Sequence, residues 1–222
     1  MLRIAVLASG RGSNLQALLD AIADGRLDAR VVGVFSDKAD ALALERARAA
    51  GIAAVALQPR DFGTRRDFDK HLFSHIDAVH PDVIVCAGYM RLLGKREVEA
   101  HAGRMINIHP SLLPAFKGLH THEQALAAGA TQHGASVHVV SAELDGGPVI
   151  AQARVAVLPG DDAAALARRV LAREHPLLVA ALRGLAAGRL VLDRHGATLD
   201  GAALSAPLQL DADDQLVAGD RA

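Results

Sequence analysis

The sequence predicts a single α/β domain with a mostly parallel, twisted sheet flanked by helices and an antiparallel part toward its C-terminus. Short apolar runs alternate with helical patterns along the first half of the chain, which is typical of βαβ units. These runs are nearly continuous, as expected of strands that are covered on both faces. The chain has 222 residues and no linker rich in Pro, Gly and Ser, which favours one domain.

In chain order, each apolar run of the first half predicts a strand and each helical pattern between two runs predicts a helix. The expected strands are residues 3–8, 30–35, 53–57, 82–87 and 104–108. The expected helices are residues 13–23, 39–50, 65–79 and 95–102.

The pattern changes after His109. Residues 120–128 are helical, and two runs joined through the turn Asp145-Gly146-Gly147-Pro148 predict strands that can pair antiparallel. These two strands are residues 136–140 and 149–157. The sheet is therefore expected to change from parallel to antiparallel pairing in this half.

The C-terminal part begins with a long amphipathic helix over residues 161–187, whose first residues are acidic, as the helix dipole favours. Pro176 should kink or interrupt it. Residues 189–193 and 197–199 predict a terminal hairpin. We expect the domain to span residues 1–195, and residues 196–222 to hold the rest of the hairpin and a frayed tail that loses the apolar pattern.

Charge and cysteine usage exclude several classes of protein. The net charge is −1, so the sequence shows no electrostatic footprint for nucleic acid or an anionic membrane. A single cysteine, Cys86, rules out an internal disulfide and suits a reducing compartment. The apolar run at the N-terminus is too short for a membrane span and reads as the first strand. We expect a cytoplasmic protein.

A glycine-containing loop joins the first strand to the first helix. Gly10 and Gly12 let the backbone turn and bring N–H groups close to an anion, and the helix that follows adds a positive dipole end. Ser13 and Asn14 add side-chain donors. A phosphate monoester is the expected guest. A nicotinamide or flavin cofactor is disfavoured because the dinucleotide fingerprint needs a glycine where the chain has Leu15, and a structural tight turn remains open.

A candidate catalytic group follows the last parallel strand. Residues i and i+2 of a strand point to the same side, so Asn107 and His109 can face one reacting group. The amide of Asn107 can donate to a developing oxyanion, and His109 can move a proton near neutral pH. Asp145 could orient the ring of His109 and raise its pKa. Together these residues suggest acyl-type chemistry, although a structural role for the pair and an ordinary turn at Asp145 remain open.

A metal site is not predicted. Several histidines lie close together in the sequence, but their spacing fits no strong zinc pattern and Cys86 is the only thiol. These histidines are His120, His122, His133 and His138. We expect His120 to line the acyl site instead.

Three segments resemble motifs of one enzyme family. N-I-H-P-S-L-L-P at residues 107–114 and G-A-S-V-H-V-V-S-A-E-L-D-G-G-P-V-I at residues 134–150 resemble two motifs of the folate-dependent formyltransferases. S-G-R-G-S-N at residues 9–14 resembles the phosphate loop of the member that acts on glycinamide ribonucleotide. The resemblance covers about residues 1–195 and implies the Rossmann-like formyltransferase fold.

The resemblance also implies a reaction and its participants. The formyl group of the co-substrate 10-formyltetrahydrofolate would pass to the primary amine of glycinamide ribonucleotide, by direct amine attack, in de novo purine synthesis. No metal, nucleic acid or membrane is implied, and we expect a monomer or weak homodimer. By resemblance the catalytic residues are Asn107, His109 and Asp145. The substrate-binding residues are Gly12, Ser13, Asn14 and Glu174, and the folate-binding residues are Arg65, Met90, Arg91, Leu92, Leu93 and Asn107.

The chain departs from the family pattern at Arg11 and at residues 115–117. Other functions also remain open: a formyltetrahydrofolate hydrolase, another formyl transferase such as the one acting on methionyl-tRNA, or a non-catalytic nucleotide-binding module. The hydrolase usually carries an N-terminal regulatory segment, and the tRNA enzyme needs a C-terminal RNA-binding domain and a basic surface. The binding module would leave Asn107, His109 and Asp145 without a task.

Overall fold

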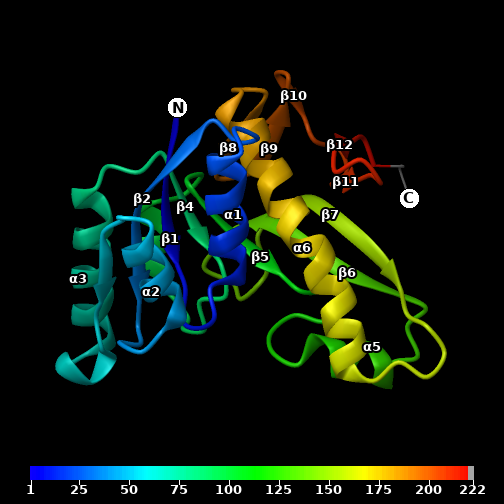
Figure 1. Ribbon diagram of the computed structural model, residues 1–222, viewed down its shortest axis with the longest axis horizontal. Coiled ribbons are helices and arrows are strands. Elements are labelled where there is room, and N and C mark those ends of the chain that lie inside the picture. The colour runs from blue at the N-terminus through cyan, green and yellow to red at the C-terminus, as the bar shows by residue number, and fades with distance from the viewer. Residues whose placement is uncertain (220–222) are drawn as a thin grey trace.

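The computed structural model describes residues 1–219 and confirms the α/β fold class, with a mostly parallel central sheet (Figure 1). The strand order of the large sheet is β12-β11-β7-β6-β5-β4-β1-β2-β3. Its strands are β1 (Leu2–Leu7), β2 (Ala29–Ser36), β3 (Ala54–Ala56), β4 (Val83–Cys86), β5 (Met105–His109), β6 (Gln132–Val139), β7 (Val149–Ala156), β11 (Leu208–Leu210) and β12 (Leu216–Val217). A small separate sheet holds β8 (Leu190–Asp193), β9 (Gly196–Leu199) and β10 (Ala202–Ala203).

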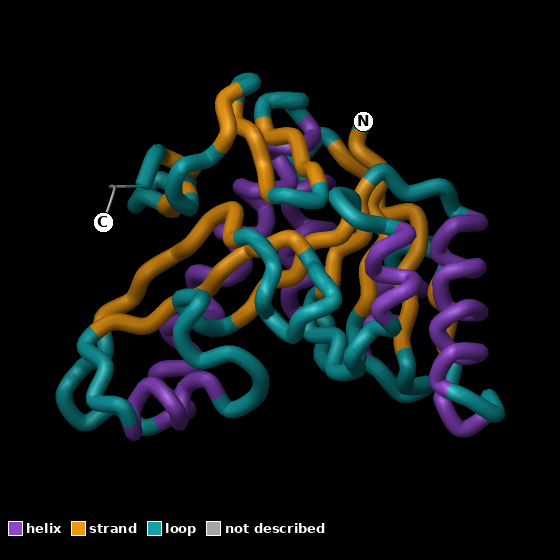
Figure 2. The backbone as a smooth tube through the Cα atoms, turned by 180° about the vertical axis from the view of Figure 1, so that it is seen from behind, coloured by secondary structure: helices purple, strands orange, loops and turns teal. Residues whose placement is uncertain are grey.

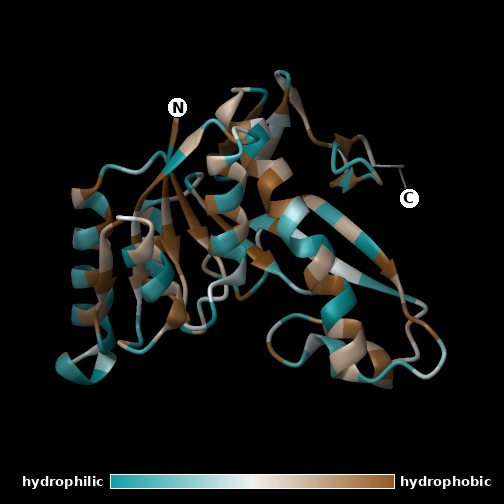
Figure 3. Ribbon diagram, in the orientation of Figure 1, coloured by the Kyte–Doolittle hydropathy of each residue, from teal (hydrophilic) through white to brown (hydrophobic). Residues whose placement is uncertain are grey.

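Helices cover both faces of the large sheet. They are α1 (Ser13–Ala23), α2 (Leu42–Ala49), α3 (Arg65–Ala78), α4 (Lys95–Ala100), α5 (Thr121–Ala127) and α6 (Ala163–Ala186), with a short 3₁₀ turn, η1, at Pro59–Asp61. On one face, α1, α2 and α6 pack on the strands through residues such as Leu15, Leu44 and Val170. On the other face, α3 packs through Phe68 and Leu72. Because both faces are covered, the central strands β1 and β4 are mostly apolar, whereas the outer surface of α3 is polar (Figure 3).

The pairing of strands in the large sheet changes from parallel to antiparallel at β5. Strands β1 to β5 pair in parallel, whereas β5 and β6, and then β6 and β7, pair antiparallel. The strands cross the middle of the molecule when it is seen from behind (Figure 2). Since β1 lies between β2 and β4, the strand order reverses at β1, and ligands of open α/β sheets bind at the carboxyl ends of the strands beside such a point.

The long C-terminal helix starts as the sequence predicts but is not interrupted. The Asp162 side chain accepts a hydrogen bond from the N–H of Ala165 and caps α6. The helix continues through Pro176, which has no N–H to donate. Burial of the following residues, including Leu177 and Leu178, offsets the lost hydrogen bond, so the helix is not interrupted, whereas a kink at Pro176 stays a prediction.

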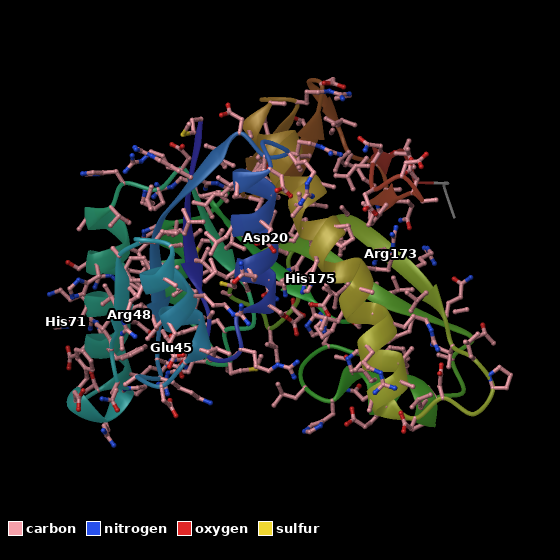
Figure 4. The ribbon with its side chains drawn as sticks, viewed as in Figure 1. Asp20, Glu45, Arg48, His71, Arg173 and His175 are labelled. Atoms are coloured by element: carbon pink, nitrogen blue, oxygen red, sulfur yellow. The ribbon has the colours of Figure 1, made fainter. Side chains whose placement is uncertain are left out.

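The segment expected to fray adds strands to the sheet. Leu208–Leu210 pairs in parallel with β7, and both leucines are buried. Arg173 of α6, on the side facing this segment (Figure 4), donates to the carbonyl of Asp211 and to the carboxylate of Asp214. The division of the chain at residue 195 stays a prediction, and residues 220–222 of the expected tail lie outside the described part.

The turn after β6 depends on Gly147. A Cβ added at this glycine would lie 1.8 Å from the carbonyl oxygen of Val139, a backbone atom of β6. The close approach accompanies the hydrogen bond from the N–H of Val139 to the carbonyl of Pro148. Only glycine lets these two backbone segments approach so closely. The turn that connects them carries Asp145.

A buried histidine pair joins α5 to β6. Nδ1 of His122 lies 3.2 Å from Nε2 of His133, and His133 is fully buried. Burial lowers the pKa of His133 to about 4, with His122 adding to the effect, and burial also lowers the pKa of His122. The ring of His133 is therefore neutral near neutral pH.

Replacing Gly147 by alanine should cost about 1–3 kcal/mol of unfolding free energy because the added methyl group overpacks the turn. Thermal denaturation should show a melting temperature lower by about 2–10 °C. The matched control is Gly63→Ala, where a Cβ meets nothing within 4 Å. An unchanged melting temperature for Gly147→Ala would contradict the packing of this turn.

Acid should destabilise the fold through His133. The unfolded ring takes up a proton near its ordinary pKa of about 6.5, whereas the folded ring resists protonation down to about 4. Stability is therefore complete above about pH 6.5 and is lost as the pH falls, by about 2 kcal/mol at pH 5. Urea denaturation at pH 7 and pH 5 should show that His133→Gln loses less stability between the two pH values than the wild type, and the exposed control His75→Gln should behave as the wild type. Equal losses of stability in the wild type, His133→Gln and His75→Gln would refute the role of His133 in acid destabilisation.

Candidate active site

Strand pairing brings two of the candidate residues together with a third side chain. Asn107 and His109 lie on β5, and Asn107 is directly opposite His138 on the antiparallel strand β6. The turn between β6 and β7 then returns the chain over this pair and carries Asp145. The structure therefore brings Asn107, His109 and Asp145 to one place, as the sequence predicts.

Asp145 lies between two imidazoles. Its Oδ2 is 3.5 Å from Nδ1 of His109, and its Oδ1 is 3.6 Å from Nε2 of His138. The N–H of Gly118 donates to Oδ2 at 2.9 Å. The side chains of Asp145 and His109 are only 8% and 7% exposed. A second contact links the group to Asn107, whose Nδ2 is 3.0 Å from Nε2 of His138.

These contacts keep Asp145 ionised. Burial raises the pKa of its carboxyl group, but the hydrogen bond with His138, the N–H of Gly118 and the electrostatic interaction with the nearby ring of His109 together lower that pKa below its ordinary value. Hydrogen bonds to the charged form favour it even in a buried place. Asp145 therefore presents a carboxylate to His109.

Burial, and not Asp145, decides the net direction in which the pKa of His109 moves. Burial lowers it most, whereas the Phe116 carbonyl and the Asp145 carboxylate raise it and His138 lowers it further. Asp145 thus raises the pKa of His109 as expected, but burial outweighs this effect and the net pKa lies below the ordinary value. A ring that is neutral near pH 7 is ready to accept a proton.

The hydrogen bonds of His109 fix where that proton goes. Nε2 is 3.0 Å from the carbonyl oxygen of Phe116, which can only accept, so Nε2 carries the hydrogen of the neutral ring. Nδ1 is left with its lone pair beside Asp145. A proton that binds to Nδ1 lies beside the carboxylate of Asp145, which stabilises the imidazolium.

One cavity connects the reacting group to the glycine loop. It has a volume of about 660 Å³, and its lining includes Asn107, His109, Asp145, Asn14 and Glu174. Nδ2 of Asn14 donates to Glu174 at 3.2 Å, while Oδ1 of Asn14 is buried and has no hydrogen-bond partner among residues 1–219. Burial raises the pKa of Glu174, and the hydrogen bond from Asn14 offsets part of the rise. These are polar groups that a ligand can engage.

The other residues of the glycine loop shape it without lining this cavity. Gly12 precedes α1 in the left-handed conformation, with φ 68°. A Cβ there would lie 2.8 Å from Cα of Ala43, so a side chain does not fit. Ser13 is the first residue of α1, where free backbone N–H groups point outward. Arg11 departs from the family pattern, but the backbone is fixed there because the carbonyl of Arg11 accepts a hydrogen bond from Arg46.

A second cavity, of about 320 Å³, meets the first at Asn107 and Asp145. Most of the predicted folate-binding residues line it: Arg65, Arg91, Leu92, Leu93 and Asn107. Met90 lines the first cavity instead, and its N–H donates to the hydroxyl of Ser9. Arg65 donates to the carbonyl of Leu92 at 2.6 Å, which fixes its guanidinium in the wall of the second cavity.

Sequence reasoning missed His138 and the two backbone groups at Phe116 and Gly118. His138 could have been found from the antiparallel pairing, because it stands opposite Asn107. The backbone groups belong to the loop that departs from the family pattern, where Lys117 pairs with Glu143 at 2.8 Å. His120 lines the first cavity, as expected, with a side chain that is 78% exposed.

Residues 1–219 also bear on two other kinds of site. In this part of the chain no group of three or more His, Cys, Asp or Glu side chains is placed to hold a metal ion. No helix within it is both long enough and apolar enough to span a membrane.

Known proteins resemble this chain over most of its length. Residues 2–182 match the formyl transferase family. The phosphoribosylglycinamide formyltransferase of Escherichia coli K12 is 50% identical over 200 residues, which cover 90% of this chain and 94% of that protein. The trifunctional purine biosynthetic protein adenosine-3 of Drosophila pseudoobscura is 47% identical over 190 residues, or 85% of this chain and 14% of that longer protein.

A solved structure agrees with this likeness. The phosphoribosylglycinamide formyltransferase of Coxiella burnetii superposes with a TM-score of 0.88 at 48% identity, and the match covers 92% of this chain and 96% of that one. The resemblance expected from the sequence motifs is thus confirmed by the family match, by whole-chain identity and by the fold. This chain belongs to the formyl transferase family.

Proposed function

We propose that this protein transfers the formyl group of 10-formyltetrahydrofolate to the primary amine of glycinamide ribonucleotide, a step of de novo purine synthesis. The observation that carries the proposal is the meeting of two cavities at Asn107 and Asp145. One cavity reaches Asn14 and Glu174 beside the glycine loop, and the other reaches Arg65. Relatives named phosphoribosylglycinamide formyltransferase support the same pair of small-molecule substrates.

The two ligands enter from opposite sides in this proposal. The phosphate of glycinamide ribonucleotide binds at the loop of Gly12, Ser13 and Asn14, where backbone N–H groups and the dipole of α1 favour an anion. Glu174 contacts the polar part of the same substrate. The folate lies in the second cavity against the segment from Met90 to Leu93, and Arg65 faces its carboxylates.

Catalysis depends on the charges at the place where the two cavities meet. The amine attacks the formyl carbon directly, and the carbonyl oxygen gains negative charge, which the amide N–H of Asn107 stabilises. Such a donor contributes about a hundredfold to a thousandfold. The attacking nitrogen loses a proton to Nδ1 of His109, and the same proton is returned to the departing folate nitrogen. Asp145 stabilises the imidazolium in between, and no covalent enzyme intermediate forms.

A hydrolase of 10-formyltetrahydrofolate would use the same three side chains with water as the nucleophile. The cavity that joins them to Asn14 and Glu174 supports a larger amine substrate. We further propose that the protein acts in the cytoplasm as a monomer or weak homodimer, with no metal, nucleic acid or membrane as partner.

The proposed function predicts that folate release depends on the amine substrate. With 10-formyltetrahydrofolate alone, the absorbance change of deformylation should be negligible, and adding glycinamide ribonucleotide should start it, with one formylated amine made per folate released. Release at the same rate without the amine would identify a hydrolase. No release under either condition would identify a binding module.

Removing any of the three proposed catalytic groups should lower turnover with little loss of stability. Asn107→Ala should reduce kcat by about a hundredfold to a thousandfold because it removes the oxyanion donor. His109→Ala should reduce it by about 10² to 10⁴, as expected for a general base. Asp145→Asn should also lower kcat, since it removes the charge that stabilises the imidazolium.

The control for these variants is His71→Ala, an exposed histidine on α3 (Figure 4), which should keep wild-type kcat. Circular dichroism and thermal melting should show that all four variants are folded. Near-normal kcat in a folded His109→Ala protein is the outcome that would refute the assigned role.

A further inference from the structure

One buried hydroxyl joins the carboxyl ends of three neighbouring strands. Strands β2, β1 and β4 are adjacent in the large sheet (Figure 1). Asp37 follows β2, Ser9 follows β1 and Met90 follows β4. The hydroxyl of Ser9 donates to Oδ1 of Asp37 at 2.5 Å and accepts from the N–H of Met90 at 2.9 Å. The mechanism described above gives Asp37 no task, although its carboxylate lies at the edge of the sheet where ligands bind.

The carboxylate of Asp37 fixes the direction of this hydroxyl. The side chains lie in a dry place, since Ser9 is 3% exposed and Asp37 is 8% exposed. A hydroxyl carries one hydrogen, so a hydroxyl that donates to Asp37 turns a lone pair toward the N–H of Met90. A short hydrogen bond to a carboxylate also polarises the hydroxyl and strengthens the second bond that it accepts. The contact at Met90 therefore depends on Asp37.

The segment that begins at Met90 has few other hydrogen bonds to its backbone. Within residues 1–219, no backbone-to-backbone hydrogen bond involves residues 90–93. Side chains hold this segment instead: the hydroxyl of Ser9 at the N–H of Met90, and Arg65 at the carbonyl of Leu92. Loss of the first contact should therefore loosen the segment against which the folate is proposed to lie.

The glycine loop, in contrast, does not need the hydroxyl of Ser9. The N–H of Ser9 donates to the carbonyl of Gly88 at 3.0 Å, and the N–H of Ala43 donates to the carbonyl of Gly10 at 3.0 Å. Both are backbone bonds, and they stay in place when the hydroxyl turns. A change at Asp37 should therefore affect the folate side of the site and spare the phosphate side.

We propose that Asp37 is a positioning residue for the folate donor and acts through the hydroxyl of Ser9. This inference rests on the proposed function. Asp37 lies outside the lining of both cavities of the site, so its effect on the donor is indirect. It holds the hydroxyl of Ser9 toward Met90 and so fixes residues 90–93 before the donor binds. A segment that is already ordered loses less conformational entropy on binding, which raises affinity.

The first test separates the two substrates kinetically. Asp37→Ala should raise the KM for 10-formyltetrahydrofolate by about five- to tenfold, as expected for one hydrogen bond. The KM for glycinamide ribonucleotide and the kcat should change by less than about twofold, because only binding of the donor is weakened. Asp37→Asn keeps an oxygen that can accept from Ser9 and should restore the donor KM to within about twofold of wild type. Calorimetric titration with the donor alone should give the same ranking as dissociation constants.

The second test asks whether Asp37 acts through Ser9. Ser9→Ala should raise the donor KM at least as much as Asp37→Ala does. Adding Asp37→Ala to Ser9→Ala should have no further effect, because residues that act through one contact are not additive. Amide hydrogen exchange, measured without ligands, should show faster exchange at the N–H of Met90 in both single variants.

The matched control is Asp40→Ala, which removes the same charge from an exposed position of the same loop and should keep the wild-type KM for the donor. Thermal melting should show that all variants are folded, and if Asp37→Ala is not, Ser9→Ala and Asp37→Asn carry the test.

Four outcomes would overturn the proposal: an unchanged donor KM in folded Asp37→Ala or Ser9→Ala, an equal rise in the KM of both substrates, a failure of Asp37→Asn to restore the donor KM, or additive effects in the double variant. Absence of formyl transfer by the wild-type protein would instead overturn the proposed function. Hydrogen exchange at Met90 would still test the contact in that case, and unchanged exchange in both variants would refute it.

Discussion

The buried carboxylate of Asp145 is the interaction on which the site depends. It lies between His109 and His138 and accepts a hydrogen bond from the N–H of Gly118. An unpaired buried carboxylate would be neutralised, since burial disfavours charge. Here the surrounding donors outweigh burial and keep it ionised. The same burial lowers the pKa of His109, so one enclosed place holds a permanent negative charge beside a neutral base.

The architecture of the sheet makes this arrangement possible. Parallel strands deliver Asn107 and His109 to the carboxyl edge of the sheet, where ligands of α/β folds bind. The antiparallel strand β6 then places His138 opposite Asn107. Its return turn, which only glycine at position 147 permits, folds Asp145 over both. A fully parallel sheet would have carried the next strand away through a helix and left the carboxylate elsewhere.

Much of the fold follows from local patterns. The apolar runs and helical repeats of the first half predict strands and helices because both arise from short-range periodicity. The interruption at Pro176 and the frayed tail do not occur, because long-range packing overrides local preference: burial on the sheet sustains α6, and β7 offers an edge to Leu208–Leu210. Register between distant strands is also not written in local sequence, which is why His138 was missed. The direction of the pKa shift of His109 depends on its burial, which a list of neighbouring charges does not reveal.

The central claim is that burial keeps His109 neutral while the ionised Asp145 beside it raises its pKa in part. Nitrogen-15 NMR of labelled histidine, followed through a pH titration, tests it most directly in the wild type and in Asp145→Asn. The account predicts that His109 titrates below its ordinary pKa of about 6.5, carries its hydrogen on Nε2 at pH 7, and titrates lower still once the carboxylate is removed. A ring that titrates above that value, or whose titration is the same in both proteins, would contradict it.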